Sequence, residues 1–131
     1  VTTVEDVKRF ENEHGELKEG DIVCFRFGWD KKWKAGEEGK AFMEDWPGIS
    51  KETAEYLLSK KVSAAATDAS ALDAIGTTNP AHKVLLGNGI YIIENVDKRD
   101  ILPPFFGVIC LPCRLKKGSG STLRLIALID K

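Results

Sequence analysis

The sequence predicts an α/β protein in a single domain that spans residues 1–131. The length suits one domain, and the composition, with 43% hydrophobic and 30% charged residues, is that of an ordinary globular protein. Helical patterns alternate along the chain with short apolar runs of the β type. The formal net charge of −1 gives no electrostatic case for binding nucleic acid, and no apolar run approaches the roughly 18 residues of a membrane span.

The opening residues predict a helix followed by a strand. Thr2 and Thr3 precede an amphipathic pattern with acidic residues in its first turn, which predicts a capped helix that ends near His14. We expect His14 to be solvated because its sequence neighbours are polar. Residues 22–27 are almost continuously apolar, which predicts a central strand covered on both faces.

A polar surface loop at residues 31–40 is expected next, flanked by Trp29, which we predict to form an aromatic wall for a planar substrate or part of the core. Ser50 is expected to cap a helix that runs to about Lys60. Residues 62–67 are mostly small and predict a short, closely packed strand.

Two polar residues, Asp68 and Ser70, come directly after this small-residue strand. Ligands of α/β proteins tend to bind at the carboxyl ends of strands, so both are candidate substrate-binding residues. A helix cap and turn explain the same residues equally well, and both readings stay open.

The stretch from residue 80 to residue 95 is where we place the chemistry. Asn79 as a cap and Pro80 at the first helical position predict a short helix that stops at Gly87, with His82 on its inward stripe together with Leu85 and Leu86. The following β-type run puts Ile90, Ile92 and Glu94 on one face of a strand. His82 and Glu94 are therefore aimed at one point.

A carboxylate in line with isoleucines must pair, protonate or bind a cation, since burying it bare costs several kcal/mol. With an inward His82 nearby, a metal ion is a candidate partner, and Asn95 or a backbone carbonyl would orient the imidazole. The alternative is that His82 is a core histidine and Glu94 caps a turn. The spacing alone does not decide between these.

The C-terminal third predicts a charged turn at residues 97–100, an extended connector at residues 102–104, and two strands, residues 105–111 and 121–129, joined by a flexible loop. Cys110 and Cys113 match C-x-x-C, but they follow a strand and lack a second pair, so we do not expect a site there.

Cysteine usage also bears on localisation. Three cysteines are too few and oddly numbered for a disulfide framework, so we expect a reducing compartment, the cytoplasm. The sequence opens at Val1 and not at a methionine, which indicates processing or further chain upstream. The sequence leaves open whether a targeting signal precedes Val1.

The order of segments resembles the C-terminal portion of the metal-dependent cyclase family, which includes kynurenine formamidases and isatin hydrolases. The resemblance covers nearly the whole chain, and the segments that carry it are GDIVCFRFGW, PGIS, TDASALD, AHKVLLGNGIYIIEN and PPFFGVICLPCRLKKGSGS. It implies a swivelling β/β/α fold, a mixed sheet against helices. It also implies hydrolysis of small amides or lactam-like rings with one or two divalent metal ions, Zn or Mn, and makes His82 and Glu94 metal ligands.

The chain departs from the family at one point. The family's other ligands come from an N-terminal His-x-Gly-Thr-His-x-Asp motif, and here His14 and His82 are the only histidines. Two ligands are fewer than a hydrolytic zinc usually takes from protein. We therefore expect an N-terminal polypeptide, or copies of this chain, to complete the site across a large interface. The alternative is a non-catalytic binding or assembly module that retains the fold.

Overall fold

The structure is a computed structural model that describes residues 1–97 and 102–129. The chain divides into two compact units, residues 1–99 and residues 100–131, which are described here one at a time. Most of the predicted charged turn at residues 97–100 lies outside the described residues.

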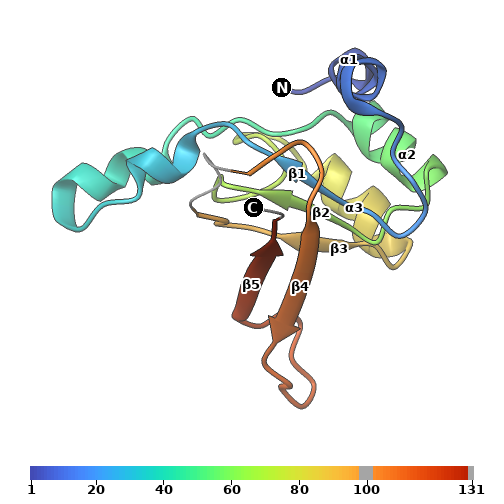
Figure 1. The fold of residues 1–131 in the computed structure, drawn as a ribbon. Coiled ribbons are helices and arrows are strands. Elements are labelled where there is room, and N and C mark those ends of the chain that lie inside the picture. Colours follow the sequence, from blue (N-terminus) through green and yellow to red (C-terminus); the bar gives the residue numbers. More distant parts are fainter. Residues whose placement is uncertain (98–101, 130–131) are drawn as a thin grey trace. The chain divides into compact units, whose positions relative to one another are not determined.

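The first unit is built on a parallel sheet with the strand order β1-β2-β3 (Figure 1). Strand β1 is Ile22–Phe25, β2 is Ala64–Thr67 and β3 is Tyr91–Ile93. In register, Cys24 lies beside Ala66, and Ala66 lies beside Ile93. The predicted α/β class is confirmed.

The prediction that residues 22–27 form a central strand is wrong. Within the described residues β2 lies in the middle and β1 at an edge, and β1 ends at Phe25. All four residues of β2 are buried, whereas only Phe25 of β1 is fully buried. Small side chains allow β2 to be covered closely on both faces, which a count of large apolar residues does not detect.

The described part of this unit has three α-helices: α1 (Val4–His14), α2 (Lys51–Ser59) and α3 (Pro80–Gly87), with α1 packed against α2. A capping box between Thr3 and Asp6 starts α1, and the Ser50 hydroxyl accepts a hydrogen bond from the N–H of Thr53 to start α2, so both predicted starts are confirmed. His14 is exposed at the end of α1, as predicted.

Helix α3 differs from the prediction in two respects. Asn79 is left-handed, with φ 55° and ψ 53°, and its side chain makes no capping hydrogen bond. Leu86, expected on the inward stripe, is 53% exposed, while Ala81 and Leu85 are fully buried. The helix is rolled so that Ala81 and Leu85, and not Leu86, face the core.

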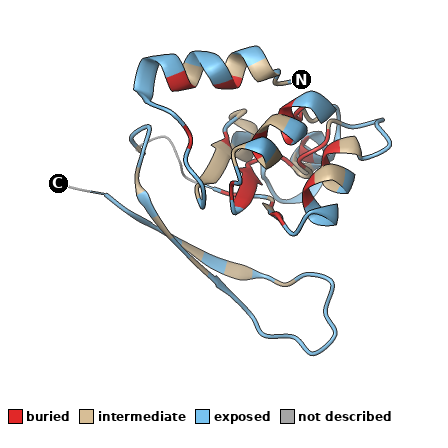
Figure 2. Cartoon of the chain, turned by 90° about the vertical axis from the view of Figure 1, so that its right-hand side faces the viewer, coloured by how far each residue is buried: buried red, intermediate tan, exposed pale blue. Residues whose placement is uncertain are grey.

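Helices α2 and α3 pack against each other and share one hydrophobic core with the sheet. Figure 2 shows the buried residues gathered in these elements. The core includes the side chains of Val7, Leu17, Phe25, Ile49, Ala54, Leu57, Val62, Ala65, Leu72, Ala81, Leu85 and Ile90.

The predicted polar loop between β1 and α2 contains two 3₁₀ helices, η1 (Trp29–Lys32) and η2 (Gly36–Met43). The excursion is mostly exposed, as predicted, but Phe42 is buried. Its ring meets that of Trp33 edge to face, with the ring centroids 4.8 Å apart.

The second unit is an antiparallel hairpin of β4 (Gly107–Pro112) and β5 (Leu123–Leu128). The two predicted C-terminal strands and their connecting loop are confirmed.

Among the described residues, no helix is both long and apolar enough to cross a bilayer.

Candidate metal site

The candidate site residues gather where the chain leaves the parallel strands. Because β2 and β3 run parallel, their carboxyl ends lie at the same edge of the sheet. Asp68 follows the end of β2, and Glu94 follows the end of β3. His82 is brought there by the first turn of α3.

The convergence of His82 and Glu94 predicted from the sequence is found in the structure. Nε2 of His82 lies 3.2 Å from Oε1 of Glu94, and the two side chains are 26% and 31% exposed. Both are therefore partly buried but reachable. The same Glu94 oxygen accepts a hydrogen bond from the backbone N–H of Leu72 at 3.2 Å.

The other nitrogen of His82 is held by Asp73. Nδ1 lies 2.7 Å from Oδ2 of Asp73, whose side chain is 1% exposed. The Asp73 carboxylate also accepts hydrogen bonds from the backbone N–H groups of Ala81 and His82, each at 2.9 Å. Asp73 thus caps α3 in place of Asn79 and anchors the imidazole at the same time.

Asp73 takes the role that sequence reasoning gave to Asn95 or a backbone carbonyl. Asn95 instead donates its backbone N–H to the carbonyl of Ala69. The only sequence signal for Asp73 was its place among the polar residues after β2. The contact with His82 depends on how the chain turns between Asp73 and His82, and no pattern in the sequence predicts that turn.

The geometry around His82 fits a metal ligand. Two donor atoms bound to one tetrahedral ion at about 2.0–2.2 Å lie about 3.3–3.6 Å apart, and Nε2 of His82 and Oε1 of Glu94, separated by 3.2 Å, need to move apart only slightly to reach this range. Metal-binding histidines commonly donate their other ring N–H to a carboxylate, which is the position that Asp73 occupies. His82 and Glu94 are thus two suitable donors.

Residues 1–97 and 102–129 do not provide a third donor at this point. In the described part of the chain, no group of three histidine, cysteine or acidic side chains could hold a metal ion. Asp73 does not count, because its carboxylate faces the opposite nitrogen of His82. Cys110 and Cys113 are free thiols on and beside β4. That the C-x-x-C pair is not a site stays a prediction.

Asp68, a predicted substrate-binding residue, holds the backbone that follows β1 in place. Asp68 is 1% exposed, and its carboxylate accepts hydrogen bonds from the backbone N–H groups of Phe27 and Trp29, at 2.9 and 3.0 Å. These bonds fix the turn that follows β1. The other two candidates bind elsewhere: the indole N–H of Trp29 donates to the carbonyl of Phe42, and the Ser70 hydroxyl lies 3.5 Å from the sulfur of Met43.

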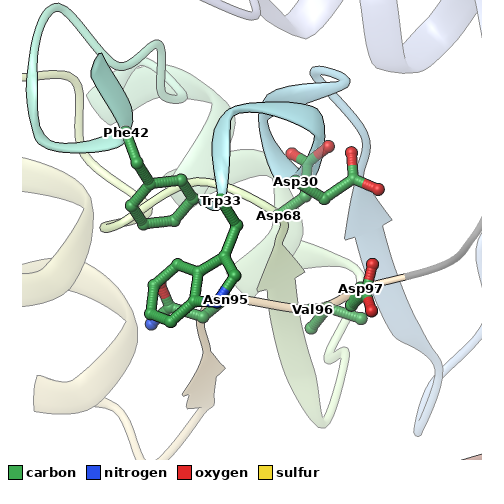
Figure 3. Close-up of a pocket in the computed structure, with 7 residues that line it drawn as sticks. All are labelled: Asp30, Trp33, Phe42, Asp68, Asn95, Val96 and Asp97. Carbon is green, nitrogen blue, oxygen red and sulfur yellow. The ribbon is translucent and has the colours of Figure 1, made fainter. Parts of the chain in front are cut away.

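Asp68 also lines a pocket of about 220 Å³ (Figure 3). The rings of Trp33 and Phe42 lie on one side beside Asn95, and the carboxylates of Asp30 and Asp68 lie on another. Val96 and Asp97 complete the wall. Trp29 and Ser70 are not among the lining residues, so the aromatic wall predicted at Trp29 is provided here by Trp33 and Phe42.

One pocket atom has an unmet hydrogen-bonding requirement. Oδ1 of Asp30 is buried, and within the described residues it has no hydrogen-bond partner. A buried acceptor of this kind is costly unless a donor reaches it.

Comparisons with known proteins agree with these features. Residues 1–74 match a family model described as "Putative cyclase". The chain is 32% identical over 142 aligned residues to an isatin hydrolase from Roseibium aggregatum, an alignment that covers 100% of this chain and 53% of that protein. A kynurenine formamidase from Salinibacter ruber is 30% identical over 88 residues, which cover 63% of this chain and 42% of that enzyme.

A solved structure shows the same arrangement of elements. The crystal structure of an isatin hydrolase bound to the product analogue thioisatinate matches with a TM-score of 0.90 and 31% identity, over 100% of this chain and 53% of its own length. The chain thus spans about half the length of the isatin hydrolase that it matches.

Proposed function

The chain belongs to the cyclase family, and from this premise we propose that it forms part of a metal-dependent hydrolase of amide or cyclic amide bonds in small molecules. The resemblance seen in the sequence is confirmed, and so is the family fold. Isatin hydrolase and kynurenine formamidase are the relatives that suggest the reaction class.

One observation carries the proposal: Nε2 of His82 and Oε1 of Glu94 lie 3.2 Å apart while Nδ1 of His82 is held by the buried Asp73. A nitrogen lone pair and a carboxylate oxygen at this distance favour a cation between them. We propose that His82 and Glu94 bind a divalent ion, Zn²⁺ or Mn²⁺, and that the remaining ligands come from outside the described residues. An N-terminal polypeptide or a further copy of the chain would supply them.

In this proposal the chain's own residues hold the metal ion and orient its ligands. A divalent ion at this position supplies a Lewis acid that polarises an amide carbonyl and makes water a better nucleophile. His82 binds it through Nε2, Glu94 contributes negative charge, and the N–H of Leu72 keeps Glu94 aimed at the same point.

We propose that the organic part of the substrate enters the pocket of Figure 3. The Trp33 and Phe42 rings offer an apolar surface to a planar group. Hydrolysis of an amide creates a new carboxylate, which the acidic side chains of the pocket repel. This charge change favours release of the product.

Three cysteines are too few and oddly numbered for a disulfide framework, which supports the cytoplasm as the compartment in which this hydrolase works.

The test is hydrolysis of isatin and of an aryl formamide, with Zn²⁺ or Mn²⁺ supplied. The chain is assayed alone and together with a polypeptide that corresponds to the remaining half of the isatin hydrolase relative. We expect activity only in the combination, and we expect His82→Ala to abolish it. His14→Ala is the matched control and should retain activity, since His14 is exposed at the end of α1. Activity that survives His82→Ala would refute the proposal.

A further inference from the structure

We propose that Asp73 is a positioning residue that keeps the proton of the His82 imidazole on Nδ1 and so leaves Nε2 free to bind a metal ion. This inference rests on the proposed function, in which Nε2 of His82 is a metal ligand. It adds to that function the residue that decides which tautomer of His82 is present.

Two carboxylates contact the ring of His82 and compete for its proton. Asp73 lies 2.7 Å from Nδ1 and is 1% exposed, whereas Glu94 lies 3.2 Å from Nε2 and is 31% exposed. The shorter and more deeply buried contact is the stronger hydrogen bond, because water competes with it less. Asp73 therefore draws the proton to Nδ1.

Asp73 is also the more rigidly held of the two acids. It accepts the backbone N–H groups of Ala81 and His82, so its carboxylate is fixed to the same helix turn that carries the imidazole. Its own carbonyl oxygen accepts the indole N–H of Trp46 at 2.9 Å. Neither Asp73 nor the ring can turn away without breaking several hydrogen bonds.

Removing Asp73 reverses the competition. Glu94 is then the remaining carboxylate in contact with the His82 ring, and it favours the proton on Nε2. A protonated Nε2 has no lone pair for a metal ion. The structure thus assigns to Asp73 an effect on metal binding that is separate from its effect on the stability of α3.

Two substitutions separate these effects. In Asp73→Asn the amide oxygen can replace Oδ2, which serves both the N–H of His82 and Nδ1, while the bond from the N–H of Ala81 is lost. Asp73→Asn should therefore lower the melting temperature yet keep the His82 tautomer. Asp73→Ala removes both the cap and the ring contact, and it should change the tautomer.

Ser50→Ala provides a matched control for the loss of a helix cap. The Ser50 hydroxyl caps α2 through the N–H of Thr53, and within the described residues it forms no hydrogen bond with His82. This variant should lower the melting temperature as a cap loss does and leave the imidazole of His82 unchanged. It shows what a purely structural defect produces.

The first readout is the ¹⁵N NMR spectrum of the imidazoles in the metal-free 131-residue chain at about pH 8.5, above the usual pKa range of histidine. His14 and His82 are the only histidines, so His14→Gln completes the assignment. We expect a protonated Nδ1 for His82 in the wild type, in Asp73→Asn and in Ser50→Ala, and a proton shifted toward Nε2 in Asp73→Ala. A protonated Nδ1 in folded Asp73→Ala would overturn the inference.

The second readout is metal affinity of the assembled protein, measured by competition with a chelator. We expect Asp73→Ala to weaken Zn²⁺ binding by about 10- to 100-fold, while Asp73→Asn and Ser50→Ala stay within a few-fold of wild type. An equal loss in Ser50→Ala and Asp73→Ala would overturn the inference. A wild-type assembly that binds no metal would refute the proposed function, and the NMR result would still decide the role of Asp73.

Discussion

At the scale of single residues, the candidate metal site is a row of three side chains in which His82 lies between two acids. Asp73 is buried and holds Nδ1, and Glu94 is partly exposed beside Nε2. The same Glu94 oxygen is kept in place by the N–H of Leu72, the residue before Asp73. One segment, Leu72–Asp73, therefore orients both proposed ligands.

Glu94→Gln tests the charge of the second ligand at this scale. The glutamine keeps the shape of the side chain and an oxygen for the N–H of Leu72, but it loses the negative charge that a metal ion requires. We expect metal occupancy of the assembled protein to fall about tenfold or more, measured by elemental analysis after dialysis.

Glu13→Gln is the control for this measurement, because Glu13 is exposed on α1 and makes its contact with His14. It should leave occupancy unchanged. If Glu94→Gln also leaves occupancy unchanged, Glu94 is a turn cap and not a ligand.

At the scale of elements, α1 and α2 are joined by a buried carboxylate. Glu11 of α1 accepts hydrogen bonds from the Tyr56 hydroxyl and from the backbone N–H of Leu17, and it forms an ion pair with Lys60 at 3.0 Å. Burial by itself would raise the pKa of Glu11, but the hydrogen bonds and the Lys60 charge outweigh it and hold the pKa below its ordinary value of 4.5.

This lowered pKa predicts an acid-sensitive junction. Because the folded state holds Glu11 ionised more strongly than the unfolded state does, its stabilising effect is complete above pH 4.5 and is lost as the pH falls through the folded-state pKa. Glu11→Gln should cost about 1–3 kcal/mol at pH 7 and flatten the dependence on pH below 4.5. Urea unfolding between pH 7 and pH 3 measures both effects, and an unchanged pH dependence would contradict the assignment.

For the β4–β5 hairpin, we predict that its two cysteines do not contribute to metal binding. Cys110 and Cys113 match a metal-binding spacing, but burial raises the pKa of the Cys110 thiol, which disfavours the thiolate that binds metal. Cys110→Ser combined with Cys113→Ser should leave the metal content of the assembled protein unchanged. Loss of zinc from this double variant would place the site on the hairpin.

Elements with local signals could be predicted from the sequence, and those that depend on distant contacts could not. Neighbouring residues in the sequence predict the capped start of α1, the Ser50 cap of α2 and the two C-terminal strands. The structure confirms all three. The edge position of β1 depends on which strands pair. The pocket contribution of Trp33 depends on how η1 and η2 fold back, which spacing does not reveal.

The candidate site was half predictable for the same reason. His82 and Glu94 each lie on an element with clear periodicity, so their convergence followed from the sequence. The contact between Asp73 and His82 spans a turn with a left-handed Asn79, and propensity gives no orientation for such a segment.

At the scale of the whole molecule, the parallel sheet presents edges that further chain could cover. Within the described residues β1 and β3 are the edge strands, and Ile22, Val23 and Cys24 of β1 are only half-buried. We predict association with a second polypeptide or with copies of the chain, through an interface well above about 2,000 Å². Light scattering that shows a stable monomer of 14.5 kDa under all conditions would contradict this and favour a non-catalytic module.

The most direct test of the metal site is an anomalous diffraction map of the assembled protein crystallised with Zn²⁺ or Mn²⁺. We predict one peak between His82 and Glu94, at about 2.0–2.2 Å from Nε2 and from a carboxylate oxygen, with Asp73 still bound to Nδ1. Further ligands should come from residues beyond those described here. A peak at any other location, or none at His82 with the metal bound elsewhere, would contradict the assignment of His82 and Glu94 as the metal ligands of this chain.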